Sequence, residues 1–295
     1  YLYPATMHKT MRFFTRKGRC YWLKCYEIPE GDKNFKGRAI QNMLNIDPDD
    51  SVNALLRLRG LNDEEFVKSH YVVFATKNGT VKKTSLEAYS RPRTNGVNAI
   101  NIVEGDEVVD VRLTNGKNEI ILANRNGRAV RFDEDSIRTM GRVSTGVRGM
   151  KLDEGDDEVV GMIVVNNAET ETVMVVSENG YGKRSQVEDY RKTNRGGKGV
   201  KTFSITEKTG RLVAIKNVTD DNDLMIINKS GIAIRLAVSE CRVMGRATQG
   251  VRLINLSKKN DVIASVCKVM SSEKEADVEG YKDDETSQPL NPPTA

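Results

Sequence analysis

Leu122-Ala123-Asn124-Arg125-Asn126-Gly127 is a strand end that runs into a tight turn, and the chain contains five stretches of this kind. Asn and Gly accept positive φ, which is typical of the short turn of a β-hairpin. The other four copies are Phe13–Gly18, Phe74–Gly79, Val175–Gly180 and Ile226–Gly231. The sequence therefore predicts five hairpins.

A second glycine follows each hairpin glycine, 17 residues later in the second copy and 19 residues later in the others: Gly37, Gly96, Gly146, Gly199 and Gly250. An apolar strand and then a closing strand follow, the closing strands being expected at Val52–Leu58, Val108–Leu113, Val159–Val165, Leu212–Val218 and Val262–Val269. Repeats of about 50 residues, each forming one small antiparallel sheet, indicate blades around an axis. We expect an all-β, propeller-like fold of repeated four-stranded blades, with five complete repeats and, at Leu2–Met7, part of a sixth.

The blades are expected to occupy residues 1–270, and residues 271–295 are expected to form a disordered acidic tail. An insertion near Arg59–Ser69 is expected to be a surface loop or a short helix. The tail has seven acids and two bases, a net charge of −5, so that the rest of this +5 chain carries +10. A basic body beside an acidic end suggests a polyanion as partner and a tail that competes for the same surface.

The composition argues against several other classes of protein. No run approaches the roughly 18 apolar residues that a membrane span needs, and the first residues, which have no basic region or long apolar run, are not expected to be a signal peptide. The absence of an initiator Met suggests part of a longer protein. Four scattered cysteines are expected to be reduced thiols in a cytoplasmic protein. Two unplaced histidines and the lack of a phosphate-binding loop give no support for catalysis, a metal site or a bound cofactor, and the Asp156-Asp157 pair is expected to be solvated.

Basic residues recur at fixed positions in the repeats. Four residues after the hairpin glycine lie Lys83, Arg131, Arg184 and Arg235, with Trp22 in the first repeat. These cations and others around the second glycine are predicted to form a basic rim, which comprises Lys82, Lys83, Arg91, Arg93, Arg131, Arg138, Arg142, Arg148, Lys183, Arg184, Arg191, Lys192, Lys201, Arg235, Arg242, Arg246 and Arg252. The alternative is that they are ordinary outward-facing strand residues, which are often Lys or Arg.

The loop before Gly199 is the most suited to phosphate. It reads Asn194-Arg195-Gly196-Gly197-Lys198-Gly199, with three glycines and two cations but no carboxylate. Glycine allows close approach to the backbone, and the cations neutralise phosphate charge. A plain surface turn is the alternative. A basic rim on a disc fits curved duplex DNA held without base readout, since no recognition helix or aromatic stacking platform is visible.

These residues resemble the C-terminal domain of DNA gyrase A subunits over essentially residues 1–270. The stretch Thr193–Gly199 is similar to the heptapeptide box Gln-Arg-Arg-Gly-Gly-Lys-Gly of that family, with five of seven positions in agreement. The stretches Gly18–Glu30, Asn78–Thr84 and Gly180–Arg184 are also similar to it. The principal box of the family lies in the family's first blade, which would precede the five complete repeats and of which we expect only Leu2–Met7 here. Thr193–Gly199 therefore looks like a second copy or a related loop.

The resemblance implies a β-pinwheel of six blades that wraps double-stranded DNA around its edge, without sequence specificity. It implies a bacterial, cytoplasmic, nucleoid-associated holoenzyme of A₂B₂ composition that introduces negative supercoils with ATP. Mg²⁺, ATP and the catalytic residues would belong to the B subunit or to other regions of the A subunit, so this domain is expected to be inactive on its own. The isolated domain is also expected to be monomeric. Two alternatives stay open: the matching C-terminal domain of topoisomerase IV, and a propeller-type scaffold for protein interactions.

Overall fold

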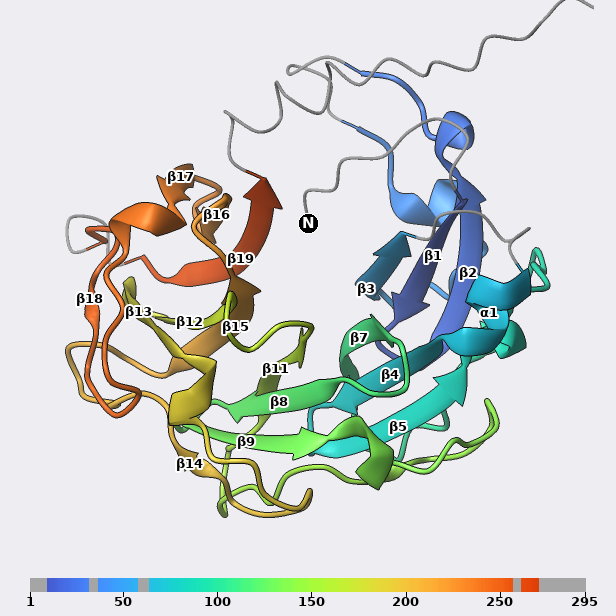
Figure 1. Ribbon diagram of the computed structural model, residues 1–295. Coiled ribbons are helices and arrows are strands. Elements are labelled where there is room, and N and C mark those ends of the chain that lie inside the picture. The colour runs from blue at the N-terminus through green and yellow to red at the C-terminus, as the bar shows by residue number, and fades with distance from the viewer. Residues whose placement is uncertain (1–9, 32–36, 58–63, 257–260, 271–295) are drawn as a thin grey trace, which may run out of the picture.

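The computed structural model of the chain describes residues 10–31, 37–57, 64–256 and 261–270. Strands dominate this part of the chain and form five antiparallel sheets, which stand as successive blades in an arc around one axis (Figure 1). In the described ranges four of the sheets have four strands and one has three. The all-β, propeller-like arrangement predicted from the repeats is thus confirmed. The predicted strand at Leu2–Met7 and the predicted tail lie outside the described residues.

Each blade takes one hairpin and one closing strand from its own repeat. Blade 1 contains β1 (Thr10–Thr15), β2 (Arg19–Lys24) and β3 (Val52–Arg57). Blade 2 contains β4 (Tyr71–Thr76), β5 (Thr80–Ser85) and β7 (Val108–Thr114). Blade 3 contains β8 (Glu119–Asn124), β9 (Arg128–Asp133) and β11 (Val159–Val165). Blade 4 contains β12 (Thr172–Ser177), β13 (Tyr181–Gln186) and β15 (Leu212–Val218). Blade 5 contains β16 (Asn222–Asn228), β17 (Ala233–Ala237) and β19 (Ile263–Met270).

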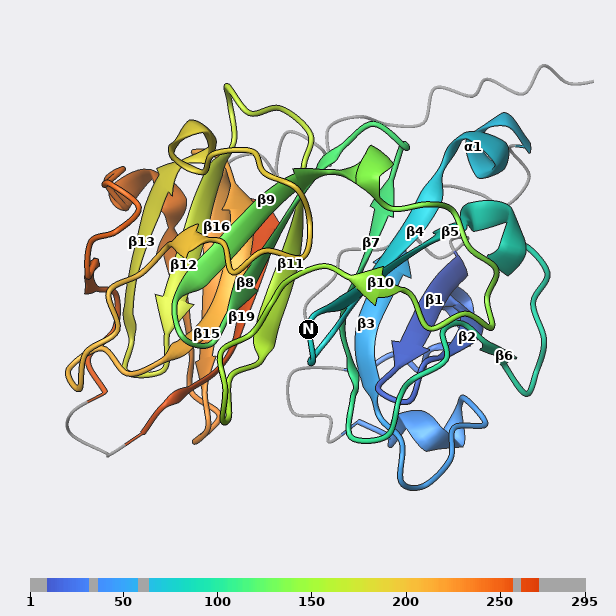
Figure 2. The same cartoon turned by 90° about the horizontal axis from the view of Figure 1, so that it is seen from below.

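The fourth, outermost strand of blades 1 to 4 comes from the following repeat. These short outer strands are β6 (Val97–Asn98), β10 (Val147–Arg148), β14 (Val200–Lys201) and β18 (Val251–Arg252). They pair with β2, β5, β9 and β13 in turn, and Figure 2 shows β10 beside β5. The expectation that each repeat forms its own sheet is therefore wrong, because the segment after the second glycine crosses to the preceding blade. Within the described residues blade 5 has no outer strand of this kind.

The second glycine makes this crossing possible. Gly199 has a φ of +73°, and a Cβ atom there would lie 2.2 Å from the carbonyl oxygen of Ala129 on the neighbouring blade. At Gly146 and Gly250 a Cβ atom would lie 2.5 Å from a carbonyl oxygen of β5 or β13. Only a residue without a side chain fits such a close backbone approach.

Hydrophobic cores lie between adjacent blades as well as within them. Phe14 of β1 meets Phe74 of β4 edge to face, with ring centroids 5.3 Å apart, and both pack near Tyr89. The inner strands β3, β7, β11, β15 and β19 each contact the next one around the axis. Backbone hydrogen bonds add to this contact, since the amides of Val108, Val159, Leu212 and Ile263 donate to the hairpin turn of the preceding repeat at 2.8–3.0 Å. The blades are therefore joined by packing, by exchanged strands and by hydrogen bonds.

Helix is scarce in the described part. The insertion of the first repeat contains α1 (Glu64–Ser69), as predicted. The other helical elements are single 3₁₀ turns: η1 (Cys25–Glu27), η2 (Ile40–Asn42), η3 (Leu86–Tyr89), η4 (Glu134–Ser136), η5 (Val187–Asp189) and η6 (Val238–Glu240). No helix among the described residues has the length and apolar character needed to cross a membrane.

Candidate nucleic-acid interface

The outer strands carry an exposed cation at one register. Arg148, Lys201 and Arg252 each occupy the second position of their strand, after a half-buried valine. Successive strand residues point to opposite faces, so that burial of the valine turns the cation to solvent. Figure 1 shows β14 and β18 on the outer side of the arc. The equivalent residue of β6 is Asn98, which is half-buried.

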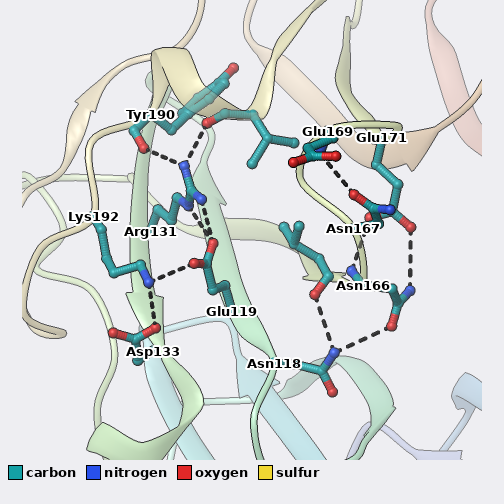
Figure 3. A network of polar contacts seen from close by, with 12 residues as sticks. Asn118, Glu119, Arg131, Asp133, Asn166, Asn167, Glu169, Glu171, Tyr190 and Lys192 are labelled. Atoms are coloured by element: carbon teal, nitrogen blue, oxygen red, sulfur yellow. Dashed lines mark hydrogen bonds and ion pairs between the residues drawn. The ribbon is translucent and has the colours of Figure 1, made fainter.

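The segments that lead to the outer strands add further exposed cations. Arg91, Arg93, Arg138, Arg191 and Arg242 are all exposed. Lys192 is also exposed, but its ammonium forms ion pairs with Glu119 at 2.6 Å and Asp133 at 2.9 Å (Figure 3). Part of the predicted rim is therefore exposed to solvent, and Lys192 within it already has carboxylate partners.

Two arginines of the predicted basic loops do not face solvent freely. They donate hydrogen bonds that hold the segment before an outer strand in place. Arg195 is half-buried, and its guanidinium donates to the carbonyl oxygens of Ser136 (Nε, 2.9 Å) and Arg148 (Nη1, 3.0 Å). Arg246, in the next repeat, donates in the same way to Asp189 (2.9 Å) and Lys201 (2.6 Å). Each guanidinium therefore holds its loop against an outer strand that carries an exposed cation. Arg142, at the same position of the third repeat, is half-buried as well.

The box-like loop, Asn194–Gly199, packs against β10 of blade 2 and the residues that follow it. The amide of Gly196 donates to the carbonyl oxygen of Gly149 at 2.6 Å, and that of Lys151 donates to Gly197 at 2.9 Å. The loop lines an open cavity of about 500 Å³, together with residues of β9 and with Arg191. Such an open cavity with cations at its edge can accept a phosphate group.

Lys198 is the exposed cation of the box-like loop. Its ammonium lies 2.8 Å from a carboxylate oxygen of Asp153, and this hydrogen bond lowers the pKa of Asp153. Surface pairs of this kind contribute little to stability. A phosphate could therefore compete with Asp153 for Lys198.

The cations four residues after each hairpin glycine do not form a shared exposed row, contrary to the prediction. Lys83 and Arg184 are buried, and Arg131 is half-buried, while Arg235 is exposed but paired with Asp223 at 2.7 Å. Arg131 donates to the carbonyl oxygens of Val187 and Tyr190 and pairs with Glu119 (Figure 3). Trp22, at the same register in blade 1, donates to the carbonyl oxygen of Tyr89 at 3.1 Å. An indole and a guanidinium thus have the same structural role in two blades.

Glu119 is the shared partner in this network. Although burial acts to raise the pKa of Glu119, hydrogen bonds from Lys192 and Arg131 lower it below its usual value. Arg131 and Lys192 are consequently held between blades 3 and 4 by one carboxylate, and neither is a freely exposed DNA ligand.

Lys82 and Lys183 are the clearest departures from the prediction, because both are fully buried. Lys82 donates to the carbonyl oxygens of Ala99 (2.7 Å) and Arg142 (2.6 Å). Lys183 donates to those of Gly245 (2.7 Å) and Arg246. Burial lowers the pKa of each lysine to about 7. Strand alternation could have shown that the adjacent residues Lys82-Lys83 and Lys183-Arg184 do not all face one rim. It could not have shown that both members of each pair are buried, because this burial comes from contacts with the next repeat.

A repeated aspartate is a site that the sequence analysis missed. Asp50, Asp106 and Asp157 each precede a closing strand by two residues, and each accepts a backbone N–H of its hairpin turn at 2.8–3.2 Å. Asp157 is buried, contrary to the expectation of a solvated pair, and Asp156 pairs with Arg211 at 2.6 Å. The sequence does show this pattern, because an Asp recurs two residues before three of the closing strands, and it could have predicted this role.

The described residues offer no cluster of three or more His, Cys, Asp or Glu side chains that could hold a metal ion. Cys20, Cys25, Cys241 and Cys267 are free thiols.

Comparison with known proteins gives consistent matches. A family model described as "DNA gyrase C-terminal domain, beta-propeller" matches residues 13–59, 70–115, 118–166, 171–219 and 222–267, one match for each of the five repeats. The chain is 43% identical over 268 residues to the DNA gyrase A subunit of Staphylococcus aureus strain MRSA252, and equally so to that of strain NCTC 8325. These alignments cover 91% of this chain and 30% of each relative, so the chain spans about 30% of the length of these relatives.

Two solved structures have a similar fold. One is a crystal structure of the C-terminal domain of DNA topoisomerase IV, with a TM-score of 0.79 and 27% identity over 93% of this chain and 84% of that one. The other is a DNA gyrase A C-terminal domain, with a TM-score of 0.77 and 24% identity over 90% of this chain and 84% of that one.

Proposed function

The chain belongs to the family of DNA gyrase C-terminal domains, and from this premise we propose that it binds duplex DNA along the outer edge of its arc of blades and wraps it. The carrying observation is the exposed cation at one register of three consecutive outer strands, Arg148, Lys201 and Arg252. Because the blades follow an arc, a duplex that touches all three cations has to bend. The basic segments before these strands would extend the interface.

The energies are compatible with bending. Bending 20–30 base pairs by 40–90° costs about 1–6 kcal/mol. Each phosphate that a cation neutralises releases condensed counterions and strengthens binding, most of all at low salt. Several such contacts per blade offset the cost of the bend. Contacts of this kind fix the path of the DNA but carry no sequence information, so the binding is expected to be independent of sequence.

A topological assay tests the wrapping. A nicked circular DNA is ligated in the presence of the protein, and the linking number of the products is measured after the protein is removed. A wrapped duplex shifts the linking number in proportion to the bound protein. An unchanged linking number, in a sample where DNA binding is demonstrated separately, would contradict wrapping.

The activity of the longer protein is a second part of this proposal. The similar relatives are gyrase A subunits of which the aligned region covers 30%, so they are about three times as long as this chain. We propose that this domain presents wrapped DNA to the B subunits and the rest of the A subunits in an A₂B₂ holoenzyme, which introduces negative supercoils with ATP in the bacterial cytoplasm. The domain itself would supply DNA binding and no catalytic group.

A second candidate function is that of a topoisomerase IV C-terminal domain, because a solved domain of that kind has a similar fold, with a TM-score of 0.79. The same assay separates the two candidates. A domain that bends DNA without completing a wrap leaves the linking number unchanged, whereas a wrapping domain shifts it. The 43% identity to gyrase A subunits favours the first candidate.

A further inference from the structure

A cavity of about 400 Å³ lies where the inner strands of all five blades meet, away from the outer strands. Its walls come from β3, β7, β11, β15 and β19, which lie around the axis of the arc in Figure 1. Three cations line it: Arg112 of β7, Lys216 of β15 and Lys268 of β19. The one carboxylate in the lining, Asp110, pairs with Arg112 at 3.0 Å.

The two lysines lack direct partners. Within the described residues, neither the ammonium of Lys216 nor that of Lys268 has a hydrogen bond or an ion pair in the structure. Burial lowers the pKa of Lys216, and the charge of Arg112 lowers it further against the opposing effect of Asp110. Burial also lowers the pKa of Lys268, where Glu171 opposes the charges of Arg112 and Lys216. Cations that repel one another in a confined space are stabilised by a bound anion.

Water can enter this cavity. Lys216 is only half-buried and Lys268 is exposed, although protein surrounds both side chains closely enough to shift their pKa. Partial exposure together with a lowered pKa is expected of lysines that line a cavity open to solvent. A small anion can therefore reach them, whereas a cavity of about 400 Å³ is far too small to hold duplex DNA.

We propose that this axial cavity is a binding site for one small polyvalent phosphate anion, held by Lys216 and Lys268 with Arg112. The cavity has the volume of a small-ligand site, and three cations against one carboxylate leave two positive charges, which a divalent anion balances. Such an anion would contact blades 2, 4 and 5 together. It would thereby stabilise the arc from its inside, independently of the proposed DNA contacts on the outside.

Thermal unfolding of the whole chain tests the site, with pyrophosphate and orthophosphate as probes and sodium chloride at matched ionic strength as the reference. We expect the melting temperature to rise with millimolar pyrophosphate and to saturate, with one site per chain by isothermal titration calorimetry. The variants Lys216→Gln and Lys268→Gln should each weaken this binding by about tenfold, since each removes a charge-assisted hydrogen bond.

The order of stability supplies a second readout. Without phosphate, Lys216→Gln should be at least as stable as the wild type, because it removes an unpartnered cation. In saturating pyrophosphate it should be less stable than the wild type. A matched control, Arg148→Gln with Lys201→Gln on the outer strands, should keep the full response to pyrophosphate.

Three outcomes would overturn the proposal. An unsaturable rise that is equal in the wild type and all variants would be a general salt effect. Loss of the response in the outer-strand control would place the anion at the outer edge. A response that Lys216→Gln and Lys268→Gln both retain would exclude the axial cavity.

Discussion

At the scale of single residues, cations in this protein have two different roles that the sequence alone does not separate. Lys183 and Arg252 are both basic, but the first is buried under carbonyl oxygens of the next repeat and the second is exposed on β18. The buried lysines bind backbone carbonyl groups across the boundary between repeats. They therefore position the segment that carries the exposed cations.

This burial predicts an unusual dependence of stability on pH. The pKa of Lys183 is lowered to about 7 by burial, whereas in the unfolded chain it is expected near 10.4. Between these values the unfolded state binds more protons than the folded state, so that stability should rise with pH across this window. Urea unfolding of the wild type at pH 7 and pH 9.5 measures the rise.

The variant Lys183→Met should show a smaller rise over the same interval, because it has lost one of the two buried lysines with this shift. Lys117→Met, a change at an exposed lysine, is the matched control and should behave as the wild type does. Identical pH dependence in the wild type and Lys183→Met would show that Lys183 keeps its proton in the folded state.

At the scale of elements, the second glycine of each repeat controls the exchange of the outer strand. Gly199→Ala is expected to destabilise the protein by more than the roughly 1–2 kcal/mol that positive φ alone costs an L-residue. The added Cβ atom would also lie 2.2 Å from the carbonyl oxygen of Ala129, where the backbone of β9 cannot easily move. Chemical denaturation measures the loss.

Gly197→Ala is a closely matched control for this prediction. It lies in the same loop, and the nearest atom to an added Cβ would be 3.9 Å away. We expect a change of less than about 0.5 kcal/mol, which is usual for surface substitutions. A comparable loss in both variants would mean that the loop tolerates no side chain at all, and that backbone approach at Gly199 is not the cause.

The elements themselves were largely predictable, because hairpins depend on local turn chemistry. The five strand–turn–Gly stretches do form the β1–β2, β4–β5, β8–β9, β12–β13 and β16–β17 hairpins. The partner of the segment after the second glycine was not predictable from the repeat, because Val200 could pair within its own blade or with β9 equally well by pattern. The choice between these two partners depends on how closely the backbones of adjacent blades approach, which no local spacing in the sequence reveals.

The candidate site was predictable only in part for a related reason. Recurring Lys and Arg residues in the sequence show that a region is positively charged, but they do not show which face of a strand each side chain occupies. Arg148, Lys201 and Arg252 follow a valine that packs inward, and this local pattern does predict exposure. Arg195 and Arg246, by contrast, are held by carbonyl groups some 45 to 59 residues away in the chain. Such distant partners could not be found from spacing.

At the scale of the whole molecule, the arc gives the protein one curved outer side, where Figure 1 labels β14 and β18. The exposed cations of β10, β14 and β18 belong to these outer strands. The exchange of strands between repeats contributes to this arrangement, because blades 2, 3 and 4 each receive their outer cation from the next repeat. DNA that follows the edge therefore meets residues of repeats 3, 4 and 5 at Arg148, Lys201 and Arg252. The salt dependence of binding reports how many phosphates these cations neutralise.

The triple variant Arg148→Gln, Lys201→Gln, Arg252→Gln is expected to make the negative slope of log K against log salt shallower, by about 0.9 for each phosphate that is no longer neutralised. Fluorescence anisotropy with a duplex of random sequence, from low to moderate salt, measures the slope. The control triple Lys77→Gln, Lys117→Gln, Lys229→Gln removes the same charge from turns and loops between strands. Equal reductions in the two triples would mean that only net charge matters, and an unchanged slope in the first would mean that DNA does not follow the outer strands.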